Sequence, residues 1–476
     1  MKFTDGMWMT RAGYTVESPG EIYEVKADGE GLTFFCPYVA VQHRGNTLDG
    51  GLLTVRITAG RKGTIAVRLT NHRGALDMMP RFPLDRGTDK PEAGEADGFW
   101  FLRSGELEAR VFAGKSWRIE YRWRGRLLTA AGPKGMAHIL DQRTGETYLR
   151  ERLELSVGEN IYGLGERFGP FVKNGQSIDL WNADGGTDSE QAYKNVPFFL
   201  SSRRYGVFVN STGCVSYEIG SESATKTQFS VPGEEMEYFI FAGDTPKDVL
   251  TAYTALTGRA PELPEWSYGL WLSTSFTTDY DEKTVLSFVD GMIERKIPLS
   301  VFHFDCFWMK AFEWSSFLWD RDVFPDPEGL LEKLHQRGLK VCVWINPYIA
   351  QKSPIFEEGM QKGYFVKTGD GGIWQWDRWQ AGMALVDFTN PAAVSWYQGK
   401  LAALVDMGVD CFKTDFGERI PTSDPFYGPK AAKFGVRWFD GSDPEGMHNY
   451  YTYLYNKAVF DLLVRKKGQG EACLFA

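Results

Sequence analysis

The sequence predicts a multidomain protein in which an N-terminal all-β sandwich is followed by an incomplete (β/α)8 TIM barrel. Three observations support this fold class. The chain has 476 residues, more than one ordinary hydrophobic core spans. Residues 1–242 contain short runs in which apolar and polar residues alternate. After residue 266 the pattern changes to short apolar runs separated by amphipathic helices, which is typical of repeated βα units.

The sandwich is predicted from runs such as 53–57 and 64–69, in which every second residue is apolar. Turns rich in Gly, Asp and Asn separate these runs. We assign residues 1–245 to this domain. Residues 246–265 form the expected linker, with a short helix and then a proline-rich stretch that favours an extended backbone.

The first part of the barrel is assigned to residues 266–476, ending in about the fifth strand. Helices are expected around 285–293, between the cap Asn390 and Gly408, and between the cap Asp443 and Gly468. The strands between them are nearly all apolar, so both of their faces should be buried. The five predicted strands are 268–272, 299–304, 339–345, 409–413 and 472–475.

Such strands suit either a doubly wound sheet or a barrel. The run 162–165 superficially matches a dinucleotide fingerprint, but Gly169 comes one residue late and no βαβ unit surrounds the run. A nucleotide site is therefore disfavoured, and the barrel is the better prediction.

The composition excludes several classes of partner. The net charge of -9 and the isoelectric point near 5.4 argue against nucleic acid, which is bound through clustered cations. We find no apolar run of signal-peptide or membrane-spanning length, so a cytoplasmic protein is expected, neither secreted nor membrane-bound. The six cysteines and six histidines are scattered, which predicts buried free thiols, no metal site and no cofactor.

The strongest catalytic candidate is Asp415, at the end of the fourth predicted strand. In a barrel the reactive groups stand at the carboxyl ends of the strands. Lys413 lies two residues earlier on the same strand face and could pair with Asp415, which would favour the ionised carboxylate that a nucleophile requires. A structural ion pair or a helix cap explains the position equally well.

Other strand ends suggest a sugar site. Asp305 ends the second strand, and Trp308, Trp314 and Trp344 offer surfaces on which a sugar ring can stack. His303 and His335 are interpreted as core and helix-surface residues. Glu418 is a further candidate acid, although its neighbour Arg419 suggests a salt bridge instead. Packing between barrel and helices remains the alternative explanation for the tryptophans.

Four segments resemble the glycoside hydrolase family 31, and the resemblance extends over the whole chain. They are residues 413–418, 162–166, 304–308 and 343–347. The bacterial α-xylosidase branch is the most similar. This resemblance implies hydrolysis of α-xylosides or xyloglucan oligosaccharides with retention of configuration, through a covalent xylosyl-enzyme on Asp415.

The resemblance also implies the substrate-binding residues. Asp305 and Lys413 would line the sugar subsite, which Phe276, Phe307 and Trp344 would shape. Because xylose is glucose without the hydroxymethyl group, a pocket selects xylose by filling the space of that group, and we expect Phe307, helped by Cys306 and Phe276, to do so. Asp184 resembles a loop aspartate that the sandwich contributes to the active site. One departure is the stretch 423–437, which is longer than the family pattern and leaves the leaving-group side undefined.

Alternatives remain open. One is another family 31 activity, α-glucosidase or transglycosylase, and another is a sugar-binding protein without turnover, because only one of the two required carboxyl groups is assignable. A nicotinamide oxidoreductase is disfavoured by the glycine pattern. Homo-oligomerisation is a further option that the sequence leaves open. Because the sequence stops inside the apolar run 472–476, we expect a truncated or partial chain whose general acid lies beyond Ala476 and which alone does not hydrolyse substrate. A split enzyme is a less favoured alternative.

Overall fold

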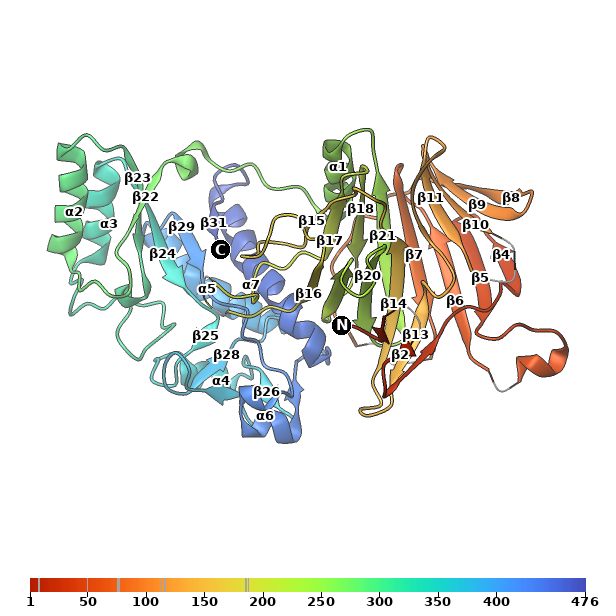
Figure 1. Cartoon of the computed structure of the whole chain (residues 1–476). Coiled ribbons are helices and arrows are strands. Elements are labelled where there is room, and N and C mark those ends of the chain that lie inside the picture. Colours follow the sequence, from red (N-terminus) through yellow and green to blue (C-terminus); the bar gives the residue numbers. More distant parts are fainter. Residues whose placement is uncertain are drawn as a thin grey trace. The chain divides into compact units, whose positions relative to one another are not determined.

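The computed structural model describes residues 1–6, 9–48, 50–74, 78–112, 114, 117–184, 186 and 188–476. The chain divides into two compact units, Met1–Arg259 and Ala260–Ala476. The described residues of unit 1 are all-β apart from two short helices, and unit 2 alternates strands with helices (Figure 1).

Unit 1 contains two large antiparallel sheets among its described residues. Alternate residues of the strands turn apolar side chains toward a shared core, for example Val55 and Ile57 in the strand 52–58 and Tyr217 and Ile219 in the strand 215–219. In spatial order, the first sheet is β15 Ile161–Gly163, β17 Phe198–Ser201, β18 Tyr205–Val209, β21 Glu235–Ala242, β7 Thr64–Thr70, β6 Leu52–Thr58, β5 Gly31–Pro37 and β4 Glu24–Ala27. The second is β16 Gln176–Leu180, β19 Val215–Ile219, β20 Lys226–Pro232, β14 Thr147–Glu154, β13 Ala137–Asp141 and β3 Tyr14–Glu17.

A further antiparallel sheet and several short elements complete unit 1. The short helix expected at the start of the segment 246–265 forms, and its Tyr253 ring stacks on Phe198 with 4.1 Å between the ring centroids, so this helix packs on the sandwich. The remaining elements are β12 Arg126–Ala131, β11 Ile119–Trp123, β10 Leu107–Phe112, β9 Phe99–Ser104, β8 Glu92–Ala96, the pair β1 Thr4–Asp5 and β2 Met9–Thr10, the 3-10 helix η1 Arg44–Thr47 and α1 Pro246–Thr257.

The glycine-rich run 162–165 belongs to unit 1 and starts no nucleotide-binding unit. β15 pairs antiparallel with β17, and a loop rather than a helix follows it through residues 164–175. A Cβ atom at Gly165 would lie 2.0 Å from the carbonyl oxygen of Lys194, so the glycine permits a close approach of two backbones. The argument against a dinucleotide site is thereby supported.

Unit 2, all of whose residues are described, is built on a five-stranded parallel sheet that curls as part of a barrel (Figure 1). Each predicted strand is present, with bounds shifted by no more than two residues at either end. The strands lie in the order β22 Leu270–Ser273, β23 Leu299–Phe304, β24 Lys340–Ile345, β29 Cys411–Thr414 and β31 Leu474–Phe475. The helices between them are α2 Glu282–Glu294, α3 Pro327–Gln336, α4 Phe356–Gln361, α5 Pro391–Met407, α6 Pro429–Phe434 and α7 Pro444–Lys467.

The expected helix caps are present. Asn390 accepts a hydrogen bond from Ala392 N–H at the start of α5, and Asp443 accepts from Glu445 and Gly446 at the start of α7. Smaller elements lie at the carboxyl edge of the sheet. They are η3 Cys306–Trp308, η4 Pro425–Tyr427, the antiparallel set β25 Tyr348–Ile349, β28 Met383–Leu385 and β27 Gln375–Trp376, and the pair β26 Lys367–Thr368 and β30 Val436–Arg437. The 3-10 helix η2 Glu265–Tyr268 precedes β22 and lies at the amino end of that strand.

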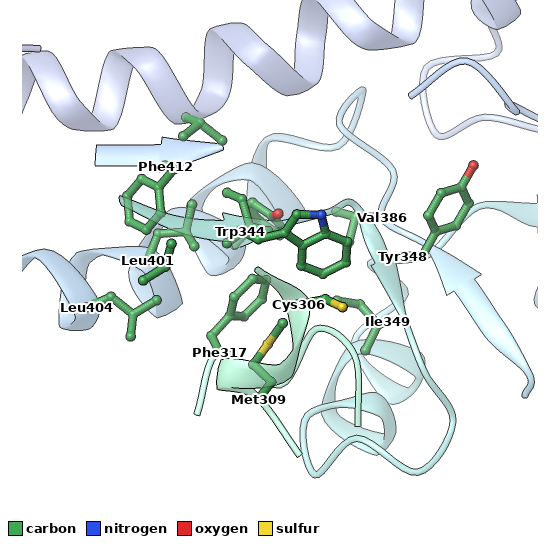
Figure 2. Close-up of a cluster of buried hydrophobic side chains, with 14 of the residues drawn as sticks. Cys306, Met309, Phe317, Trp344, Tyr348, Ile349, Val386, Leu401, Leu404 and Phe412 are labelled. Carbon is green, nitrogen blue, oxygen red and sulfur yellow. The ribbon is translucent and has the colours of Figure 1, made fainter. Parts of the chain in front are cut away.

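The two faces of the parallel sheet have different cores. One face packs against helices, and Figure 2 shows Phe412 of β29 among Leu401 and Leu404 of α5. The opposite face forms a smaller cluster in which Val301 meets three thiols. Those thiols belong to Cys342, Cys411 and Cys473, which are buried and not disulfide-bonded, as the sequence predicted.

Candidate active site

The carboxyl ends of β23, β24 and β29 bring Asp305, Asn346 and Asp415 to one edge of the sheet. Trp344 is in register with Lys413, and the backbone N–H of Asp415 donates to the carbonyl of Ile345 over 2.9 Å. The parallel register therefore fixes the position of Asp415 relative to the preceding strand.

The carboxylate of Asp415 is held by a tryptophan. Trp344 Nε1 donates a hydrogen bond to Asp415 Oδ2 over 2.6 Å. Trp344 is itself 2% exposed, and its carbonyl accepts from Trp308 Nε1 over 2.8 Å. The ring of Trp314 lies 4.9 Å from that of Trp344. Asp415 is thus a half-buried carboxylate with a fixed orientation and one oxygen held by a neutral donor.

The direct pairing that we expected between Lys413 and Asp415 is corrected by the structure. Among the described residues, Lys413 forms no ion pair, and its ammonium lies 6.0 Å from the centroid of the Phe475 ring. Strand alternation correctly put both side chains on one face, but two residues of strand rise keep the groups apart. Trp344, on the neighbouring strand, takes the place beside Asp415.

Asp305 and Cys306 form a tight turn at the end of β23. The Asp305 carboxylate accepts from Cys306 N–H over 2.8 Å, and Tyr280 OH donates to the Asp305 carbonyl over 2.9 Å. Cys306 is 3% exposed. Burial, and then the nearby charge of Asp305, raise the pKa of this thiol far above its ordinary value, so the thiol stays protonated and acts as an apolar group.

His303 lies beneath this turn and is a buried residue of the strand, as interpreted from the sequence. Its Nδ1 shares a hydrogen bond with Ser273 Oγ over 2.7 Å. Burial lowers its pKa to about 4, with Asp305 opposing and Lys413 reinforcing that shift. The imidazole is therefore neutral near pH 7.

Phe276 and Phe307 are the most exposed of the candidate residues, at 67% and 40%. Both line a hollow of about 470 Å³ whose wall also contains Asp279 and Tyr280. Because Tyr280 donates to the Asp305 carbonyl, the hollow adjoins the strand end that carries Asp305. The structure therefore brings Phe276, Asp305, Cys306 and Phe307 to the same pair of strand ends.

The residues after Asp415 form a strained aromatic turn. Phe416 has φ 64°, a left-handed conformation that is rare for an aromatic residue, and Gly417 follows with φ 113°. The Phe416 ring stacks on Trp379 with 4.4 Å between the centroids and meets Trp344 edge-on at 6.2 Å. Trp379 was missed by the sequence reasoning, although the aromatic run 374–379 offered a signal.

Helix α7 supports this turn from behind. Thr452 Oγ1 donates to the Gly417 carbonyl over 2.6 Å, and Thr414 Oγ1 donates to Asn456 Oδ1 over 2.5 Å. Glu418 is buried beyond the turn, and Tyr348 OH donates to the Arg419 carbonyl over 2.9 Å. The last strand residue and the turn after Asp415 are thus both fixed to α7.

Asp184 belongs to unit 1. It is half-buried, and its Oδ1 accepts a hydrogen bond from Gly186 N–H over 3.2 Å, which is the contact of an ordinary turn residue. Its predicted role in the barrel site stays a prediction. Among the described residues we find no group of three His, Cys, Asp or Glu side chains placed to hold a metal.

Comparisons with known proteins show which family this chain belongs to. The Glycosyl hydrolases family 31 TIM-barrel domain matches residues 260–476, and the Glycosyl hydrolase 31 N-terminal galactose mutarotase-like domain matches residues 54–218. The chain belongs to glycosyl hydrolases family 31. The predicted sandwich contains the residues that match the N-terminal domain of this family, and the predicted first part of a barrel contains most of those that match its TIM-barrel domain.

Two relatives resemble this family 31 chain along its whole length. The alpha-xylosidase XylQ of Lactiplantibacillus pentosus is 51% identical over 476 residues, which are 100% of this chain and 61% of the relative. An alpha-xylosidase of Emericella nidulans is 45% identical over 497 aligned positions, with 100% and 62% covered. The chain thus spans about three fifths of the length of these relatives.

Solved structures agree on the fold. A family 31 dextranase of Flavobacterium johnsoniae in complex with isomaltotriose has a TM-score of 0.81 at 22% identity, covering 96% of this chain and 54% of its own. An alpha-xylosidase from a soil metagenome, complexed with xylose, has a TM-score of 0.74 at 19% identity, with 95% and 64% covered. In the described part of this family 31 chain, no helix combines the length and the apolar composition that crossing a bilayer requires.

Proposed function

We propose that this chain carries the nucleophile side of the active site of a retaining α-xylosidase, with Asp415 as the nucleophile. The observation that carries the proposal is the carboxylate at the end of β29, oriented by Trp344 Nε1 at 2.6 Å. The whole-length similarity to two proteins named alpha-xylosidase supports the choice of xylose.

The proposed reaction has two steps. An Asp415 oxygen bonds to C1 of the xylosyl group while the bond from C1 to the leaving oxygen breaks, and that oxygen takes a proton from a general acid. Water then attacks C1 from the face opposite Asp415 and gives a proton back to the group that acted as the acid, while the bond between C1 and the Asp415 oxygen breaks and frees the carboxylate. The second carboxyl group, normally about 5 to 5.5 Å from the nucleophile, is not assigned to a residue of this chain.

The other candidate residues bind the sugar in this proposal. The Asp305 carboxylate accepts hydrogen bonds from hydroxyl groups of the sugar, and the Lys413 ammonium donates hydrogen bonds to them. Phe307 and the neutral thiol of Cys306 occupy the space into which the hydroxymethyl group of glucose would extend, and steric exclusion of this kind is worth about one to three decades in relative rate. Phe276 and Asp184 complete the assigned set.

The setting of the enzyme is also part of the proposal. Five buried free thiols, among them Cys342, Cys411 and Cys473, are most compatible with a reducing cytoplasm. We also propose that the enzyme binds α-linked oligosaccharides, takes part in carbohydrate metabolism and forms a homo-oligomer. Neither nucleic acid nor a membrane is among the proposed partners.

A mechanism-based label tests the nucleophile without any general acid, because fluoride leaves C1 without being protonated. Incubation with 5-fluoro-α-xylosyl fluoride should add one fluoroxylosyl group to the protein, and peptide mapping should place the ester on Asp415. The Asp415→Asn variant should stay unlabelled, and Asp424→Asn, an exposed carboxylate in the same domain, should label normally. An ester on another residue, or no ester on a folded protein that binds xylose, would contradict the assignment.

A further inference from the structure

Asp305, at the end of β23, is held by the loop that follows β22. The backbone N–H of Asp305 donates to Thr274 Oγ1 over 3.3 Å, and the Asp305 carbonyl accepts from Tyr280 OH over 2.9 Å. Thr274 and Tyr280 are both buried, at 3% and 8% exposure. One loop, residues 274–280, thus holds both backbone polar groups of Asp305, and we call Thr274 and Tyr280 the Asp305 clamp.

The clamp acts on the Asp305 carboxylate through a single peptide plane. The carbonyl that Tyr280 holds and the N–H of Cys306 belong to the same planar peptide group. That N–H donates to Asp305 Oδ1 over 2.8 Å, so the orientation of the plane fixes the position of one carboxylate oxygen. Among the described residues, no N–H or O–H group donates to the other oxygen. That second oxygen therefore keeps its capacity to accept hydrogen bonds from a ligand.

The Asp305 carbonyl has a second donor, which separates the clamp from the folding of the turn itself. Trp308 N–H donates to the same carbonyl over 3.2 Å, at the start of η3. A carbonyl oxygen has two lone pairs, so both hydrogen bonds can form together. Deleting the Tyr280 hydroxyl therefore leaves the turn with its backbone hydrogen bond and removes only the contact from the loop.

The Tyr280 hydroxyl is carried on a rigid support. The centroid of its ring lies 5.9 Å from that of Phe324 and 6.3 Å from that of Phe304, within the core of unit 2. The next residue, Asp281, is the N-cap of α2 and accepts from Thr284 N–H over 2.8 Å. The position of the hydroxyl is therefore set by the core and by the start of a helix.

We propose that Tyr280 is a positioning residue for the reaction, which with Thr274 directs the Asp305 carboxylate toward the hydroxyl groups of the sugar. A carboxylate that is oriented before the sugar arrives loses less conformational freedom on binding, so its hydrogen bonds contribute more to the affinity. This inference rests on the proposed function, since it takes Asp305 to bind the xylosyl group. Tyr280 and Thr274 act on the sugar only through Asp305.

The affinity for methyl α-xyloside, followed by tryptophan fluorescence, tests the proposed role. Tyr280→Phe removes only the hydroxyl and should weaken binding about 3- to 10-fold, in line with one hydrogen bond. The matched control is Tyr451→Phe, which removes a buried hydroxyl that donates to the Val386 carbonyl over 2.8 Å, and it should bind within about twofold of the unchanged protein. Thr274→Val should weaken binding, whereas Thr274→Ser keeps the acceptor oxygen and should retain most of the affinity.

A double-variant cycle distinguishes positioning from a merely structural role. If Tyr280 acts through the Asp305 carboxylate, its hydroxyl should no longer matter once that carboxylate is absent. Tyr280→Phe should therefore cost under about twofold in an Asp305→Ala background. An unchanged affinity in Tyr280→Phe alone, or the same loss with and without the Asp305 carboxylate, would overturn the inference.

Hydrogen exchange tests the clamp in the absence of any sugar. In Tyr280→Phe the backbone amide of Cys306 should exchange about 3- to 10-fold faster than in the unchanged protein, while Tyr451→Phe should leave its rate unaltered. An unaltered rate in Tyr280→Phe would also overturn the inference. Failure of the unchanged protein to bind methyl α-xyloside would instead contradict the proposed function, and the exchange of Cys306 would still decide whether the clamp holds Asp305.

Discussion

Replacing Asp410 by Asn should destabilise unit 2 and flatten its dependence on pH. Asp410 precedes β29 and is 6% exposed. Its Oδ2 accepts from Val341 N–H over 2.9 Å and shares a hydrogen bond of 2.8 Å with His335 Nε2. Its Oδ1 lies 3.4 Å from Lys340 Nζ and 3.3 Å from Lys467 Nζ.

The magnitude follows from the pKa of this carboxyl. Burial alone would raise the pKa, but the hydrogen bonds from His335 and Val341 and the charges of Lys467 and Lys340 outweigh it and lower the pKa from 3.8 to about 2. At about 1.4 kcal/mol for each unit, the ionised form stabilises the fold by about 2 to 3 kcal/mol. Because the folded pKa is the lower one, this stability is complete above about pH 5 and is lost as the pH falls toward 2.

Urea unfolding at pH 7 and pH 3, followed by tryptophan fluorescence, measures both effects. Asp410→Asn should lose about 2 to 3 kcal/mol at pH 7 and should have a smaller difference between the two pH values than the unchanged protein. Asp406→Asn removes a carboxylate that is 63% exposed and pairs with Lys466, and it should cost under about 1 kcal/mol. A loss at pH 7 no larger than that of Asp406→Asn would refute the reasoning.

Three further predictions concern the site. Phe307→Ala should reduce the preference for α-xylosyl fluoride over α-glucosyl fluoride by about one to three decades, measured by fluoride release, and an unchanged ratio would remove Phe307 from the specificity assignment. Trp344→Phe deletes the donor to Asp415 and should slow labelling by 5-fluoro-α-xylosyl fluoride about tenfold or more, followed by mass spectrometry. Phe416→Gly should be at least as stable as Phe416→Ala in urea, because glycine adopts the positive φ of this position without strain; a glycine variant about 1 kcal/mol weaker would argue against strain there.

The five barrel strands could be predicted from the sequence because they are buried on both faces. A run such as 299–304 is apolar almost throughout, and the structure has β23 at those residues. The short antiparallel strands at the carboxyl edge were not predicted. β25 and β27 have two residues each, which is too few for any periodicity to be visible.

The candidate site was only partly predictable. That Asp415 follows a buried strand can be read along the chain, whereas its hydrogen bond to Trp344 depends on the register between β24 and β29. Register is a property of two strands and is set by the packing of the whole sheet. For the same reason Lys413 was paired with Asp415, and Trp379 was not linked to Phe416, which is 37 positions away along the chain.

The contacts of α7 with the turn after Asp415 restrict how this gene can change in length. Adding or deleting one residue rotates the following part of a helix by about 100° and shifts it by about 1.5 Å along the axis. Such a change between Pro444 and Thr452 would turn Thr452 away from the Gly417 carbonyl and Asn456 away from Thr414. Insertions and deletions should therefore be found after Asn456 or in the loop before Asp443, while single-residue length changes inside the first half of α7 should be eliminated by selection.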